Sequence, residues 1–165
     1  MRDALPDARR RAPLRVVCVG NRWRSDDGVG LAVAARLRET LPHDVELVER
    51  EGEPTALLAV FEGGDAVWIV DAVSSGAAPG TLHRLDAAER ELPPELFRTS
   101  THHVGLAEAV ELARALGQLP TLTVVFGVEG ANFAVGDQLT EAVAAVVDGV
   151  ADAVREEVAA HVRTH

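Results

Sequence analysis

The stretch LRVVCVGNRWRSDDGVG, residues 14–30, decides the fold. Its first six residues form a nearly continuous apolar run rich in valine, which is typical of a strand buried on both faces of a sheet. A polar turn follows from Gly20, and apolar residues at every fourth position then predict an amphipathic helix over residues 28–41. A strand that leads directly into a helix is the first half of a βαβ unit.

The rest of the chain repeats this alternation of strand and helix. Short β-branched runs predict further strands, and apolar residues three or four positions apart predict further helices. The expected strands cover residues 45–49, 66–70, 81–85 and 122–126, and the expected helices cover residues 54–61, residues 106–116 and the segment from residue 140 to the C-terminus. This order predicts an α/β fold, a three-layer sandwich in which a mostly parallel, twisted sheet of about five strands has helices on both faces.

The chain has 165 residues and a formal net charge of −10. That length suits one domain, and we expect a flexible N-terminal tail over residues 1–13 and a single α/β domain over residues 14–165. The negative charge repels phosphate backbones, which argues against a nucleic-acid partner. Because no apolar run approaches the roughly 20 residues of a membrane span and no signal peptide is evident, we expect a cytoplasmic protein without membrane attachment.

Two adjacent carboxylates, Asp26 and Asp27, follow the first strand at the place where a nucleotide-binding protein carries its phosphate loop. They would repel a phosphate and would occupy the backbone N–H groups that bind phosphate in such loops, so this loop is better suited to bind a cation. The structural alternative is that one of them caps the following helix, because aspartate is favoured at that position. Taken alone, capping is the commoner role.

Two further candidate ligands lie downstream. Asp71 comes directly after the expected strand over residues 66–70, where it could equally form a turn with the serines that follow. His102 and His103 precede an expected helix, where a histidine pair is more often a surface or helix-cap feature. Since the carboxyl ends of parallel strands meet at one edge, Asp27, Asp71 and one histidine would form an open three-ligand site for zinc, nickel or another late metal ion.

Other nucleophile signatures are missing from the sequence. It contains no G-x-S-x-G elbow, no H-E-x-x-H helix and no C-x-x-C pair. The single cysteine, Cys18, lies within the apolar run of the first strand, so we interpret it as a buried small hydrophobe.

Four short motifs follow one another along most of the chain. They are Gly20-Asn21 with Asp26-Asp27-Gly28-Val29-Gly30, then Val70-Asp71-Ala72, then Ser100-Thr101-His102 with Gly105-Leu106, and finally Gly127-Val128-Glu129 with Gly136-Asp137-Gln138-Leu139-Thr140. Together they resemble the hydrogenase maturation endopeptidases, which trim the C-terminal extension from the large subunit of nickel-iron hydrogenases. Each motif alone is weak, but their order and spacing make the combination specific. The chain departs from the family pattern at Arg22 and Arg24, which make the first loop more basic.

The resemblance implies roles for individual residues. Asp27, Asp71 and His102 would contact a metal ion, with His103 as the alternative third ligand, and Asp27 and Asp71 would be the catalytic carboxylates, either of which could act as a general base. It also places four residues of the first motif in substrate binding: Gly20, Asn21, Asp26 and Gly28.

The resemblance further implies a function, an endopeptidase that processes a nickel-iron hydrogenase large-subunit precursor after nickel insertion. Nickel would be supplied by that precursor rather than held permanently, and it would serve as the recognition element. Two alternatives use the same three ligands. One is a free-standing zinc-type metallohydrolase with its own metal, and the other is a non-catalytic metal-binding or assembly module.

Overall fold

Five strands form one mostly parallel sheet in the computed structural model, which describes residues 12–51, 54–97 and 105–165. The strands are β1 (Leu14–Val19), β2 (Val45–Arg50), β3 (Ala66–Val73), β4 (Leu82–Asp86) and β5 (Leu122–Glu129). Their order across the sheet is β2-β1-β3-β5-β4, and β4 runs antiparallel to β5 while the other neighbours are parallel. The expected flexible tail falls, up to residue 11, outside the described residues.

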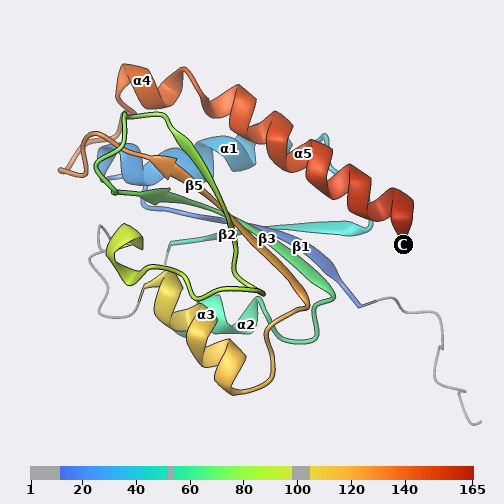
Figure 1. Ribbon diagram of the computed structural model, residues 1–165. Coiled ribbons are helices and arrows are strands. Elements are labelled where there is room, and N and C mark those ends of the chain that lie inside the picture. The colour runs from blue at the N-terminus through green and yellow to red at the C-terminus, as the bar shows by residue number, and fades with distance from the viewer. Residues whose placement is uncertain (1–11, 52–53, 98–104) are drawn as a thin grey trace, which may run out of the picture.

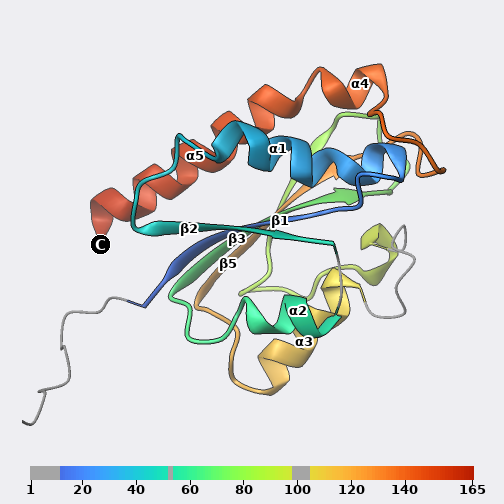
Figure 2. The same ribbon diagram turned by 180° about the vertical axis from the view of Figure 1, so that it is seen from behind.

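Helices cover both faces of the sheet, as Figure 1 and Figure 2 show from opposite sides. One face carries α1 (Val29–Leu37), α4 (Glu141–Ala144) and α5 (Val147–Thr164), and the other carries α2 (Pro54–Ala59) and α3 (Leu106–Ala115). Two short 3-10 helices, η1 (Ser25–Gly28) and η2 (Pro94–Phe97), lie in the connections. The predicted three-layer α/β sandwich is confirmed. None of the described helices is both long enough and apolar enough to span a membrane.

Side chains alternate along each strand and so divide the core into two layers. One layer, which includes Trp68, packs against α1 and α5, and the other, which includes Ile69, packs against α2 and α3. Cys18 is fully buried in the first layer. Burial, and secondly the charge of Glu49, raises the pKa of its thiol to about 12. The prediction that this cysteine is a buried hydrophobe is confirmed.

Several elements differ from the sequence expectation. β5 continues to Glu129 rather than ending at residue 126, and α1 ends at Leu37 rather than at residue 41. β3 continues to Val73 rather than ending at residue 70, because its last three residues pair with the C-terminal part of β5. Asp71 therefore lies within a strand and not in a turn after it. The last helix, expected to run without a break, is divided into α4 and α5. Thr140 occupies the N-cap position of α4, but its side chain makes no capping hydrogen bond.

Candidate active site

The carboxyl ends of β1, β3 and β5 meet at one edge of the sheet, on the left in Figure 1. There the loop after β1, residues 20–28, lies beside the loop after β5, residues 130–140. We call them the first loop and the last loop. Backbone hydrogen bonds join the two, since Ser25 N–H donates to the Gly136 carbonyl at 2.8 Å and Gly136 N–H donates back to the first loop at 2.9 Å.

Gly30 brings the start of α1 against the ends of two strands. A β-carbon at this position would lie 2.2 Å from the carbonyl oxygen of Val19 in β1 and 3.0 Å from that of Val70 in β3. No side chain fits in this space. The close approach holds η1, which carries Asp27, against β3 near Asp71.

Gly30→Ala is therefore expected to destabilise the protein by about 1–3 kcal/mol, because the new methyl group must push backbone atoms apart. Urea unfolding with constant m-values measures the effect. The matched control is Gly149→Ala in α5, where a β-carbon meets nothing within 4 Å. An alanine there should stabilise the helix by about 0.5–1 kcal/mol. Equal stabilisation by both substitutions would refute the close approach at Gly30.

Asp27 and Asp71 form a pair of interacting carboxylates at this edge. Asp27 is 8% exposed, and Asp71 is partly buried. Burial, and secondly the negative charge of Asp27, raises the pKa of Asp71 well above its ordinary value, although the Ala72 N–H donates to its Oδ1 at 2.8 Å. The structure thus brings together two residues that the rule of strand ends predicts to meet, and their chemical roles stay predictions.

Asp26, the neighbour of Asp27, has a different position. It is fully buried, and its carboxylate accepts hydrogen bonds of 2.8–3.0 Å from the backbone N–H groups of Ala131, Asn132 and Thr140. The Thr140 hydroxyl donates to it as well. Burial by itself raises the pKa of Asp26, but these donors outweigh it and leave the pKa below the ordinary value. Asp26 fastens the first loop to the last loop, and its predicted contact with a substrate stays a prediction.

The other residues predicted to bind substrate shape the first loop. Gly20 is buried, and a β-carbon there would lie 2.4 Å from the Asp27 carbonyl oxygen. Asn21 closes a turn, since its Oδ1 accepts from the Trp23 N–H at 2.9 Å and its own N–H donates to the Asp27 carbonyl at 3.0 Å. Gly28 is the N-cap of α1. The residue that caps this helix is therefore a glycine and not an aspartate, as the structural alternative had assumed. Contact of these residues with a substrate stays a prediction.

The predicted third ligand, His102, lies outside the described residues, as does its alternative His103. The segment that contains them is preceded by η2, whose Leu96 carbonyl accepts a hydrogen bond from the Ser74 N–H at 3.0 Å, three residues after Asp71. Within the part of the chain that the structure describes, no three His, Cys, Asp or Glu side chains are grouped to hold a metal ion. The three-ligand set therefore stays a prediction.

Glu129 is a buried carboxylate that belongs to the fourth motif, and its role in the structure was not predicted from the sequence. It is 2% exposed at the end of β5 and accepts hydrogen bonds from the N–H and hydroxyl of Ser75, from the Gly76 N–H, and from the His83 Nε2 at 3.1 Å. Burial raises the pKa of Glu129, but the donors prevail and lower it overall. Glu129 thus fixes the turn that follows Asp71. Its place at a strand end was the signal that could have revealed it.

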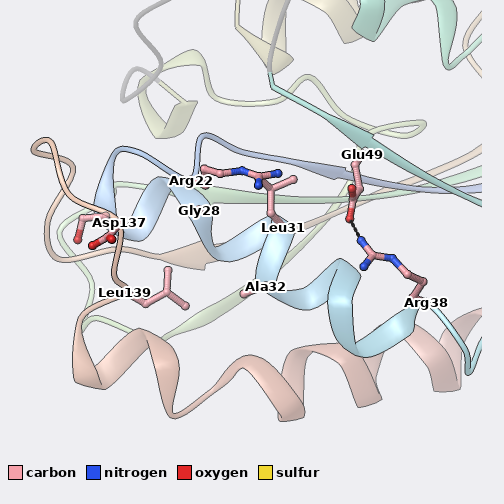
Figure 3. A pocket seen from close by; sticks show the side chains of 9 residues that line it. Arg22, Gly28, Leu31, Ala32, Arg38, Glu49, Asp137 and Leu139 are labelled. Atoms are coloured by element: carbon pink, nitrogen blue, oxygen red, sulfur yellow. Dashed lines mark hydrogen bonds and ion pairs between the residues drawn. The ribbon is translucent and has the colours of Figure 1, made fainter.

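A pocket of about 300 Å³ lies beside the first loop, as Figure 3 shows. Leu31 and Ala32 of α1 and Leu139 of the last loop provide its apolar lining. Arg22 and Asp137 also line it. Neither of the paired carboxylates lines this pocket, although Gly28, the residue after Asp27, does. The pocket is therefore a neighbouring feature and not the site itself.

Solved structures and curated relatives identify the class of protein that this arrangement defines. The fold aligns with the hydrogenase maturating endopeptidase HybD from Escherichia coli at a TM-score of 0.71 and 25% identity, over 86% of this chain and 89% of that one. The HupD hydrogenase expression/formation protein of Rhodobacter capsulatus is 30% identical over 86% of this chain and 69% of its own length. The hydrogenase 2 maturation protease of Escherichia coli K12 is 33% identical over 68% of this chain and 70% of its own length. These comparisons point to a peptidase.

The family model for hydrogenase maturation proteases matches residues 31–157, which is most of the chain. The chain belongs to the hydrogenase maturation protease family, and the resemblance seen in the sequence is confirmed.

Proposed function

We propose that this protein is an endopeptidase that removes the C-terminal extension from a nickel-iron hydrogenase large-subunit precursor after nickel insertion, and that it recognises the nickel ion carried by that precursor. The observation that carries the proposal is the carboxylate pair, Asp27 and Asp71, at the carboxyl ends of the strands. The names of the relatives agree with a hydrogenase substrate.

The electrostatics of the pair favour a cation. Two carboxylates in a partly buried site repel each other, and the raised pKa of Asp71 means that this group keeps its proton at pH values where an exposed aspartate has lost it. A divalent cation removes the repulsion and takes the place of that proton. His102 would supply the third ligand, and imidazole with carboxylates suits nickel and its neighbours. Nickel is here part of the substrate, and the protein holds no permanent metal of its own in this proposal.

Contact with nickel would place the scissile peptide bond beside Asp27 and Asp71. Hydrolysis then adds one water molecule to the carbonyl carbon. One of the carboxylates accepts a proton from that water and the leaving nitrogen receives a proton as the C–N bond breaks. The products are a large subunit with a new C-terminal carboxylate and a free peptide.

The test is to mix the purified protein with nickel-loaded and with nickel-free precursor and to measure the mass of the large subunit. We expect loss of a C-terminal peptide from the nickel-loaded precursor, and a rate at least roughly 100-fold lower without nickel, because the ion supplies the positioning contact. Equal cleavage of both precursors would refute recognition of nickel.

Metal analysis of the isolated protein separates this proposal from the alternatives. We expect no stoichiometric metal after purification, whereas a free-standing zinc-type hydrolase would retain its own ion. Binding of the nickel-loaded precursor without any change of mass would instead indicate a non-catalytic assembly module.

A further inference from the structure

Two large apolar side chains are exposed at the same edge of the sheet as the carboxylate pair. Trp23 in the first loop is 63% exposed, and Val135 in the last loop is 93% exposed. Single exposed apolar residues are common on soluble proteins, but a tryptophan that leaves most of its area in water forgoes a large burial energy. Two such side chains next to a reactive site indicate a contact surface.

The two residues belong to loops that are bonded to each other at this point. Gly136 N–H donates to the Trp23 carbonyl at 2.9 Å, and Arg24 and Gly136 form a parallel β-bridge. In that register Trp23 and Val135 occupy adjacent positions, one in each loop.

The backbone of Trp23 is also held from the other side, because its N–H donates to the Asn21 Oδ1 at 2.9 Å. Both the N–H and the carbonyl of this residue are therefore bonded within the protein. A tryptophan presented on a fixed backbone loses little conformational entropy when a partner covers it. Tryptophan is one of the residue types that most often contribute strongly to protein–protein affinity.

We propose that Trp23 and Val135 form a docking surface for the folded body of the protein substrate. The inference rests on the proposed function. The partner that fits is an apolar patch on that substrate, because both exposed side chains are apolar. The docking surface then supplies affinity that does not depend on the metal.

Continuity with the site favours the substrate as occupant over a second copy of the chain. Asn21 N–H donates to the Asp27 carbonyl, and Asp27 N–H donates to the Arg24 carbonyl at 3.1 Å, so the residues on either side of Trp23 are bonded to the residue that carries the catalytic carboxylate. Asp27 belongs to the same loop as Trp23, so a protein whose peptide bond reaches Asp27 comes next to this loop. A second copy docked here would cover the route to the site.

The test compares Trp23→Ala, Val135→Ser and the double variant with the wild type in the processing of nickel-loaded precursor. We expect Trp23→Ala to raise KM by about 30-fold, the effect of losing one major contact, with a further rise in the double variant. The value of kcat at saturation should change less than about two-fold, because the carboxylate pair is untouched. The control is Leu116→Ala at the end of α3, on the other face of the sheet, where the leucine is 55% exposed and KM should not change.

An unchanged KM in both Trp23→Ala and the double variant would overturn the docking surface and leave the proposed function intact. If the wild type cleaves nothing, the proposed function fails, and calorimetric titration of precursor into wild type and Trp23→Ala decides the docking surface by itself. Equal or absent binding in that titration overturns it. Sedimentation that shows a dimer of the wild type lost in Trp23→Ala would also overturn it, in favour of a contact between copies.

Discussion

Asp71→Asn is expected to lower kcat/KM for nickel-loaded precursor by roughly 10²–10⁴-fold, the range associated with removal of a general acid or base. The amide keeps the shape of the side chain but cannot take a negative charge, so it neither replaces a carboxylate ligand nor accepts a proton from water. Mass spectrometry of the precursor measures the rate. The control is Asp65→Asn, an exposed aspartate directly before the opposite end of β3, which should leave the rate unchanged.

The same substitution is expected to stabilise the folded protein at neutral pH. The pKa of Asp71 is raised in the folded state by burial and by Asp27, so the folded protein binds this proton more tightly than the unfolded chain does. Stability is then lost as the pH rises through the interval between the ordinary and the raised pKa. Asp71→Asn has no proton to lose, so its Tm should exceed that of the wild type at pH 8. The expected difference is roughly 2–4 °C for each kcal/mol of difference in the free energy of unfolding. It should vanish below about pH 4, where the wild-type side chain is protonated in both states.

A variant that is less stable than the wild type at pH 8 would contradict the repulsion between Asp27 and Asp71. Loss of activity with a gain of stability would be the signature of a functional site held at a cost to the fold. Full activity in Asp71→Asn would refute its catalytic role, whatever the stability.

Asp26→Ala is expected to reduce the free energy of unfolding by about 3–5 kcal/mol. The substitution leaves three backbone N–H groups and one hydroxyl without their acceptor, and each buried unsatisfied group costs about 1–3 kcal/mol before the structure relaxes. Because these bonds join the first loop to the last loop, activity should fall together with stability. Urea unfolding monitored by circular dichroism measures the first effect.

Two further substitutions serve as controls for Asp26→Ala. Thr140→Val removes one hydroxyl donor and keeps the backbone donors, so it should cost only about 1 kcal/mol. Asp137→Ala, at an exposed position in the same loop, should stay within about 0.5 kcal/mol of the wild type. A cost for Asp26→Ala no larger than that for Asp137→Ala would show that the two loops are held by other contacts.

The order of elements could be predicted from the sequence because hydrophobic period and β-branched runs depend on local pattern alone. The local pattern does not predict the bounds of an element that are set by pairing between distant strands. Asp71 is disfavoured in strands by its type, and only its register opposite Gly127 of β5 keeps it in β3. The division between α4 and α5 was missed for a related reason, since the apolar stripe continues across the break.

The candidate site could be predicted as far as the meeting of Asp27 and Asp71, because strand ends of a parallel sheet gather at one edge. The hydrogen bonds that bury Asp26 rather than Asp27 against the last loop could not. The two residues are of the same type and adjacent. The backbone N–H groups that donate to the Asp26 carboxylate lie 105 to 114 positions further along the chain. Sequence alone offers no means of telling which of the two faces those donors.

The bond between Asp26 and the last loop has a consequence for the newly made protein. During synthesis the N-terminal part emerges first, with a carboxylate whose partners at residues 131–140 do not yet exist. Until those residues are made, the Asp26 carboxylate lacks the hydrogen-bond donors that allow its burial, so it stays in water. The loop that carries Asp27 is then not held by these bonds. Competence to cut another protein would thus be acquired only after residues 131–140 have been made and have joined the first loop.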